Sequence, residues 1–318
     1  MLGTITQPDW MGHEPMSGQL RLTFPTEQKA WPSPLVVNFG GGTNSTAELI
    51  GFWERGIRPD LIPFSDTGDE KPHTYEHLWR MQEWLESVGF PSITIVRWDR
   101  KVGENAGRFI TISEQCEERR EMPSKAYGFA GCTTKWKSQP VDKYVRAWAS
   151  DVLRTGGKVT RALGFDADEP HRFGRSRDTD EWAYRYPLVE WGWGREECRQ
   201  AIARAGLEQP GKSACFMCPS SQPSEIISLR RDYPVMFLRA IDIERAAVQE
   251  RAGRDTTIIG LGRDHFSWSD LIHACDGDDD AFSRISRKAQ RAVLAYRRGQ
   301  EIDADDEDGD VCPGCWDG

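Results

Sequence analysis

The sequence has no long hydrophobic run. No apolar stretch approaches the roughly 18–20 residues that a membrane-spanning helix needs, so we expect no membrane segment. The first residues also lack the charged-then-apolar order of a secretory signal, which leads us to expect an intracellular, cytoplasmic protein. No internal repeat is found, and the 318 residues suffice for one α/β domain with a smaller appendage or for two small domains.

An overall basic charge is lacking too. The net charge is -9, but the segment 301–318 holds eight acidic residues and no Lys or Arg, and outside it 42 acids face 41 bases. Such an acidic run repels itself and is typical of a solvated tail. The nearly neutral body argues against an overall field for nucleic acid, although a local basic patch is still compatible with it.

The eight cysteines do not indicate a disulfide scaffold, because no export signal accompanies them. Two C-x-x-C pairs are present, Cys215 with Cys218 and Cys312 with Cys315. In the cytosol such a pair points more often to metal or redox chemistry than to a structural bridge. The second pair lies in the acidic tail, where a redox pair, half of a shared metal site and incidental cysteines are all compatible with the sequence.

Hydrophobic periodicity predicts alternating strands and helices. Short apolar runs predict strands at 35–39, 61–64, 93–96 and 159–165, and helical spacing predicts helices at 45–55, 74–88 and 141–153. This alternation favours an α/β fold with a mostly parallel, doubly wound sheet. Ligands bind at the carboxyl ends of such strands, so the loops after Phe39, Phe64 and Phe165 are expected to meet at one site.

The character of the chain changes near residue 186, after which helices are predicted at 196–205, 224–231, 234–251 and 281–298. We therefore predict four regions: a loose lead-in over 1–33, a nucleotide-binding α/β domain over 34–186, a helical subdomain with a cysteine metal site over 187–300, and the acidic tail over 301–318. The aromatic residue Trp268, between His265 and His273, is expected to pack in a core.

A glycine-rich turn carries the first functional signal. Gly40, Gly41 and Gly42 separate a predicted strand from a predicted helix, and the turn continues into Thr43, Asn44, Ser45 and Thr46. Glycines allow close approach of the backbone to an anion, and the N–H groups of the helix start point at it. An ordinary glycine turn with Ser45 as the helix cap is the competing interpretation.

The turn resembles the PP-loop, S-G-G-x-D-S/T, of the adenine-nucleotide α-hydrolases, which include N-type ATP pyrophosphatases and phosphoadenosine phosphosulfate (PAPS) reductases. Gly41, Gly42, Ser45 and Thr46 match that pattern, while Gly40, Thr43 and Asn44 depart from it. The segment 66–70 resembles the family's D-T-G-x-x-x-P-E-T element, and 164–172 resembles its G-I-R-x-D-E-S-x-x-R element. The resemblance extends over about residues 35–240, and the family that the chain resembles includes phage and prophage members.

The resemblance implies roles for individual residues. The acids Asp66, Asp168 and Glu169 would be catalytic, placing Mg²⁺ or binding ribose hydroxyls. Arg172, with Arg175 and Arg177, would neutralise phosphate or sulfate. The implied nucleotide-binding set is Gly40, Gly41, Gly42, Thr43, Asn44, Ser45, Thr46, Thr67, Gly68, Lys135 and Arg172. Each acid taken alone is equally compatible with a helix cap or a turn.

A second resemblance involves thiols. Cys132 to Lys135, with Pro140 beyond, resembles the C-T-x-x-x-K-x-x-P element of PAPS reductases. Together with this element, the resemblance implies a metal site made of Cys132, Cys198, Cys215 and Cys218, holding a [4Fe–4S] cluster or tetrahedral Zn²⁺. Small buried core residues are the alternative for Cys132 and Cys198. The mobile E-C-G-[IL]-H segment of sulfonucleotide reductases is missing.

These features lead to three hypotheses. The first is an enzyme that binds ATP, cleaves the bond between the α- and β-phosphates and adenylylates an acceptor, in preparation for sulfur transfer. The acceptor would be a nucleic acid, a small molecule or a protein. The second is a true PAPS or APS reductase, and the third is a non-catalytic nucleotide-binding module with structural zinc.

Overall fold

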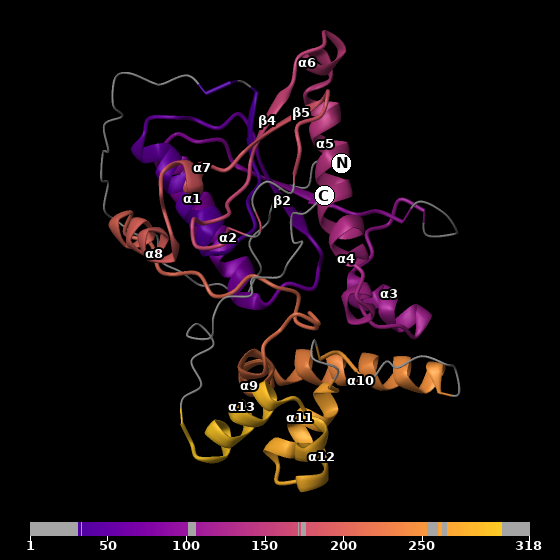
Figure 1. Ribbon diagram of the computed structural model, residues 1–318. Coiled ribbons are helices and arrows are strands. Elements are labelled where there is room, and N and C mark those ends of the chain that lie inside the picture. Colours follow the sequence, from indigo (N-terminus) through magenta and orange to yellow (C-terminus); the bar gives the residue numbers. More distant parts are fainter. Residues whose placement is uncertain are drawn as a thin grey trace. The chain divides into compact units, whose positions relative to one another are not determined.

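The computed structural model describes residues 31–32, 34–100, 106–170, 172, 176–252, 260–262 and 266–300. It is an α/β protein with small parallel sheets and about 52% helix (Figure 1). The first half alternates strand and helix as the periodicity predicts. Its elements are β1 (Leu35–Val37), α1 (Thr43–Glu54), β2 (Ile62–Asp66), α2 (Pro72–Ser87) and β3 (Ile93–Arg97).

Short helices follow before the chain returns to the sheet. They are α3 (Ile112–Arg119), the 3₁₀ helix Ser124–Tyr127, α4 (Gly131–Thr133), the π-helix Thr134–Ser138, α5 (Gln139–Trp148) and α6 (Ser150–Arg154). Then come β4 (Val159–Ala162), β5 (Trp182–Arg185), α7 (Pro187–Glu190) and α8 (Arg195–Arg204). The last elements are α9 (Pro223–Asp232), α10 (Pro234–Arg251), α11 (Trp268–Cys275), α12 (Asp279–Arg284) and α13 (Arg287–Arg297).

Parallel pairing sets the position of the candidate site. β4 pairs in parallel with β1 on one side and with β5 on the other, with Val36 opposite Arg161. β2 pairs with β3, and the N–H of Val37 donates to the carbonyl of Leu61 at 3.0 Å, which joins β1 to the start of β2. Because β1 and β4 run in the same direction, the turns that follow them emerge at one edge.

The chain forms two compact units that are discontinuous in sequence. Unit 1 contains the described residues up to Phe64 together with Glu76–Val96 and Arg146–Gln209. Unit 2 contains Ser65–Tyr75, Arg97–Val145 and the described residues from Pro210 onward. The predicted boundary near residue 186 coincides with no limit of these units, and the four predicted regions stay a prediction. The lead-in over 1–33, except Trp31 and Pro32, and the tail over 301–318 lie outside the described residues.

The apolar core of unit 1 surrounds α1. Every residue of this helix from Thr43 to Phe52 is buried, and α1 packs against α8 (Figure 1). Phe52 contacts Trp191 edge to face, with ring centroids 5.2 Å apart, and Gly51 leaves the space that the Trp191 ring occupies. Because this helix is buried on all sides, the polar side chains of Asn44, Ser45 and Thr46, described below, bond to other protein groups.

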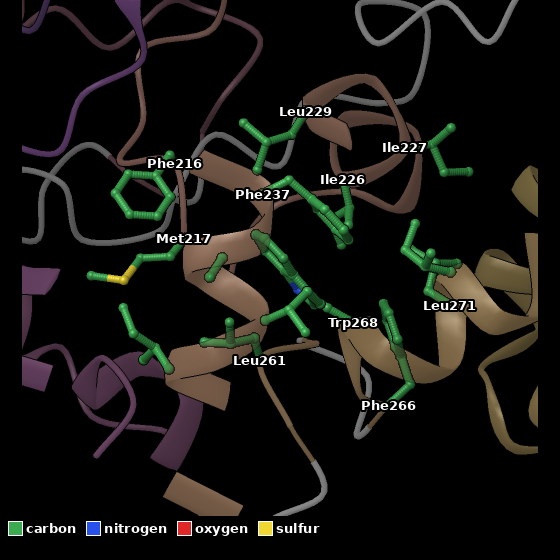
Figure 2. Packing of buried hydrophobic residues seen from close by; sticks show 14 of the residues in the cluster. Phe216, Met217, Ile226, Ile227, Leu229, Phe237, Leu261, Phe266, Trp268 and Leu271 are labelled. Atoms are coloured by element: carbon green, nitrogen blue, oxygen red, sulfur yellow. The ribbon is translucent and has the colours of Figure 1, made fainter. Parts of the chain in front are cut away.

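Figure 2 shows the core of unit 2, in which the indole of Trp268 lies among apolar side chains from α9, α10 and α11. Trp268 is fully buried, as are Leu271 and Leu261. This confirms the expectation that Trp268 is a core residue. His273 is exposed and lies 3.9 Å from Asp278, whereas His265 is outside the described residues.

The structure corrects two predicted helices and adds elements that the pattern missed. The helix predicted over 281–298 is two helices, because the backbone becomes extended at Ile285 and the Ser286 hydroxyl caps α13 by accepting from the N–H of Ala289. The helix predicted over 141–153 is interrupted at Ala149 between α5 and α6. β5, α3, α7 and α11 were not predicted. In the described parts of the chain, no helix is both long and apolar enough to cross a membrane.

Candidate functional site

The glycine turn between β1 and α1 leads directly into the start of the helix. Gly41 has a φ of 75°, in the left-handed region that favours glycine. Gly42 caps α1 without a side-chain hydrogen bond, and no acidic residue lies in the first turn of the helix. The Ser45 hydroxyl accepts from the N–H of Gly40 at 3.1 Å, which tightens the turn. The first N–H groups of α1 lack partners within the helix, and they lie at its positive end.

Asn44 connects the glycine turn to two other segments of the chain. Its amide nitrogen donates to Glu169 Oε2 at 3.2 Å, and its Oδ1 accepts from Arg195 Nη1 at 3.2 Å. An aspartate at position 44 would accept from Arg195 but would have no hydrogen to donate to Glu169. The departure from the PP-loop pattern therefore has a physical reason, since the amide satisfies an acid on one side and a base on the other.

The loop after β4 brings its acids to the same turn. Asp168 is exposed, and one of its oxygens accepts from the backbone N–H of Arg195 at 2.7 Å. A Cβ at Gly194 would overlap that carboxylate as it is placed, so the glycine lets Asp168 lie against the start of α8. Asp166 is buried and accepts from the N–H of Asp168. Burial, followed by the nearby charge of Glu169, raises the pKa of Asp166.

Arg172 is held in the interior by the same loop. Its Nη1 donates to Glu169 Oε1 at 2.8 Å, and its guanidinium carbon lies 4.3 Å from the centre of the Phe165 ring. The side chain is 3% exposed, and its Nε has no hydrogen-bond partner in the described structure. Arg177 is exposed, and Arg175 is outside the described residues.

A buried carboxyl group that the sequence did not indicate faces this turn. Glu48, on α1, is fully buried, and neither of its carboxyl oxygens has a partner among the described residues. Its Oε2 lies 3.2 Å from the position that a Cβ at Gly164 would take, and the Ser45 backbone nitrogen lies equally near that position. Burial raises the pKa of Glu48 well above its ordinary value, which favours the protonated, uncharged form of this side chain.

Thr46 anchors the turn from the other side. Its hydroxyl lies 2.8 Å from His77 Nε2 in the interior of unit 1, and His77 in turn packs near the Phe39 ring. Thr43 is buried at the same helix start. Thus the predicted residues from Gly40 to Thr46, together with Asp168, Glu169 and Arg172, lie in unit 1.

The remaining predicted acid, Asp66, lies in unit 2 and is saturated. Its Oδ1 accepts from the N–H of Gly68 and from the Tyr75 hydroxyl, both at 2.8 Å. Its Oδ2 forms an ion pair with Arg97, with Nη2 at 2.7 Å. Asp66 therefore orders its own loop. Gly68 has a φ of 77° and faces the side chains of Phe109 and Thr111, so a side chain at 68 would be strained.

Another acid of the same loop, Glu70, contacts a cysteine. Glu70 Oε1 lies 3.3 Å from Lys137 Nζ and accepts from Cys215 Sγ at 3.7 Å. The hydroxyl of Thr67 lies 3.2 Å from the same sulfur. Burial, followed by the charge of Glu70, raises the pKa of the Cys215 thiol. The preceding residue, Asp69, is buried and accepts from the N–H and hydroxyl of Ser113.

Lys135 is enclosed by aromatic rings in unit 2. Its ammonium lies 3.9 Å from the centre of the Trp98 ring and 4.1 Å from that of Trp136, and it donates to Gln115. Burial lowers its pKa from 10.5 to about 8. Lys135 lies in the π-helix Thr134–Ser138. This element is rare and occurs frequently at functional sites.

The four predicted metal ligands are divided between the units. Cys132, Cys215 and Cys218 belong to unit 2, where Cys215 and Cys218 form one turn, with the N–H of Cys218 donating to the carbonyl of Cys215. Cys198 lies in the apolar core of unit 1, and burial raises its pKa to about 12. Within the described residues, no group of three His, Cys, Asp or Glu side chains is arranged to hold a metal ion. Cys312 and Cys315 lie outside them.

Two functional candidates were missed by sequence reasoning. Arg195 bonds Asn44 across 151 positions of sequence, and no local pattern marks such a pair. Cys116 is a free thiol buried in the core of unit 2, and Cys132 contributes to the raising of its pKa, after burial and Glu121.

A scan against models of known protein families finds no match for this chain, and a search of curated proteins finds none either.

Proposed function

We propose that the protein is an adenine-nucleotide enzyme of the α-hydrolase type, which binds ATP at the turn from Gly40 to Thr46, cleaves the bond between the α- and β-phosphates and adenylylates an acceptor. The observation that carries the proposal is the glycine turn with an uncapped helix start, bonded through Asn44 to an acidic loop and an arginine. N–H groups, a helix N-terminus and guanidinium groups are the elements with which proteins bind phosphate chains.

The acids differ in their capacity to hold Mg²⁺. Glu169 is occupied by Asn44 and Arg172, and Asp66 by Arg97 and Tyr75. Asp168 is exposed, and among the described residues it accepts a hydrogen bond from the N–H of Arg195. Carboxylate oxygen suits Mg²⁺, which proteins commonly hold through one or two carboxylates and the substrate phosphates. Asp168 would therefore hold the ion, which shields charge on the leaving pyrophosphate when bound.

The other residues keep the turn in position for the phosphates. Glu169 orients Asn44 and neutralises Arg172, and Gly194 allows Asp168 to approach the start of α8. The raised pKa of the buried Glu48 favours its uncharged form, which limits the negative charge near the positive end of α1.

A second candidate, a nucleotide-binding module without turnover, is favoured by the saturation of Asp66. A carboxylate that already accepts from Arg97, Tyr75 and Gly68 is a positioning group for its own loop. Sulfonucleotide reduction remains a further alternative, for which PAPS would replace ATP as the bound nucleotide.

The test measures ATP binding by calorimetry and pyrophosphate release with Mg²⁺, for the wild type, Asp168→Asn and the control Asp180→Asn. Asp180 is an exposed acid of unit 1. We expect release to fall at least about tenfold in Asp168→Asn and to be unchanged in the control. Binding without release would establish the module instead. Failure of ATP to bind would overturn both.

A further inference from the structure

Arg195 is fixed at both ends beside the phosphate-binding turn. Its backbone N–H donates to Asp168 Oδ2 at 2.7 Å, and its Nη1 donates to Asn44 Oδ1 at 3.2 Å. It is the first residue of α8, which Gly194 caps without a side-chain bond from the cap itself. The side chain is half-buried. Its direction is therefore set by two residues of the candidate site, rather than by solvent.

Arg195 is one end of a continuous hydrogen-bonded chain. Arg195 donates to Asn44, Asn44 donates to Glu169, and Glu169 accepts from Arg172. Arg195 and Arg172 each bond into this chain through one side-chain nitrogen, so N–H donors remain at both of its ends. Guanidinium N–H donors in a partly desolvated place favour an anionic acceptor.

An independent observation concerns Arg172, at the other end of this hydrogen-bonded chain. The Nε of Arg172 is buried and has no acceptor within the described structure, although the side chain is 3% exposed. Buried N–H donors without a partner are uncommon in folded proteins, and each calls for an acceptor such as water or a bound group. The Nε belongs to the chain that ends at Arg195, so both ends of the chain have donor capacity to spare.

We infer that Arg195 is a binding residue for the phosphates beyond the α-phosphate, namely the β- and γ-phosphates of the nucleotide. The inference deepens the proposed function and rests on it for the identity of the nucleotide. Arginine has five N–H donors in a planar fork that matches two phosphate oxygens, and one of the five is recorded on Asn44. Arg195 therefore discriminates a polyphosphate from a monophosphate at this turn, with Asn44 as its positioning residue.

The experiment compares the affinities of the full chain for ATP, ADP, AMP and inorganic pyrophosphate at fixed ionic strength. The variants are Arg195→Gln, Arg195→Lys and the matched control Arg199→Gln, from the same helix. Arg195→Gln is expected to weaken ATP and pyrophosphate binding about 10- to 100-fold and to leave AMP binding within about threefold. Arg195→Lys is expected to recover part of the loss, because it keeps the charge but not the fork.

The outcomes separate the inference from the proposed function. Equal weakening of ATP and AMP, or no weakening of ATP, would overturn the role of Arg195 while the proposed function stands. Pyrophosphate binding that depends on Arg195, in a protein that does not bind ATP, would support the anion site and overturn the nucleotide function. A wild type that binds neither ligand overturns both. The melting temperature of each variant is measured first, to confirm that it is folded.

Discussion

The Glu244 carboxylate accepts a hydrogen bond from the backbone N–H of Trp268 at 2.8 Å, across 24 positions of sequence. The same carboxylate accepts from the N–H groups of Leu261 and Ser269 and from the Ser269 hydroxyl. It thereby fixes the start of α11 to α10 inside unit 2. Because four donors point at this one buried carboxylate, a group in its place that itself donates would face other donors.

Glu244→Gln should destabilise unit 2. The amide replaces one acceptor oxygen with an NH₂ group that faces hydrogen-bond donors, and we expect the free energy of unfolding to fall by about 2–3 kcal/mol. Urea unfolding followed by tryptophan fluorescence measures the change. Asp242→Asn is the control, since Asp242 is an exposed residue of the same helix whose side chain is 72% exposed. Equal effects of the two substitutions would contradict the role of Glu244.

Trp268 allows packing and polarity to be separated. Its side chain is fully buried, but its Nε1–H has no partner in the described structure. We expect Trp268→Ala to lower the free energy of unfolding by about 3–5 kcal/mol. Trp268→Phe removes the unsatisfied donor along with some volume, so the loss should be about 1–2 kcal/mol.

Leu238→Ala provides the baseline for Trp268, because Leu238 is 60% exposed on α10. The expected change is within about 0.5 kcal/mol, measured by the same urea titration. If Trp268→Phe proves as costly as Trp268→Ala, then the indole N–H is satisfied in solution and the packing account is wrong.

How far the sequence predicted this molecule depends on the range of the interactions. The apolar run before three glycines predicted the β1–turn–α1 unit, because both strand burial and turn geometry are local. The strand β5 escaped notice, since Trp182–Arg185 has one buried residue followed by three half-buried ones, and only pairing with β4 makes it a strand. A local sequence pattern does not indicate which distant strand a segment will pair with.

The same distinction applies to the candidate site. Turn residues and acids were predicted from their order along the chain, but the state of each acid depends on distant residues. Asp66 is paired with Arg97, 31 positions away, and Asn44 with Arg195, 151 positions away. The division of the predicted cysteines between two units is equally invisible in their spacing.

Asp69 should make stability depend on pH in unit 2. Burial raises its pKa from 3.8 to about 6, against the opposing hydrogen bonds from Ser113. A folded-state pKa above the unfolded one means that the protonated form is favoured by folding. The contribution is therefore full below about pH 4 and is lost as the pH rises through about 6, amounting to about 3 kcal/mol.

Asp69→Asn isolates this effect, since the amide does not titrate. Urea unfolding at several pH values between about 4 and 7 should show a wild-type stability that falls relative to the variant as the pH rises. A constant difference between the two proteins over this range would mean that Asp69 has an ordinary pKa in the folded state.

The predicted cysteine site can be tested by measuring the metal content of the purified protein. After anaerobic purification, a [4Fe–4S] cluster would give a broad absorption band near 400 nm and about four irons per chain, lost in Cys215→Ala. Zinc would instead give about one metal ion without colour. Cys198→Ala distinguishes the ligand sets, because Cys198 lies in the core of unit 1. A cluster retained in Cys198→Ala but lost in Cys116→Ala would assign the fourth ligand to Cys116.

The interleaving of the two units constrains how the chain can fold. Unit 1 is incomplete until residues near Gln209 have been synthesised, and by then its strand β2 has already continued into a loop that belongs to unit 2. Each unit must therefore close long segments of chain that contain part of the other, which adds loop entropy and slows folding. No single cut in the chain separates the units, so they cannot be produced as independent halves.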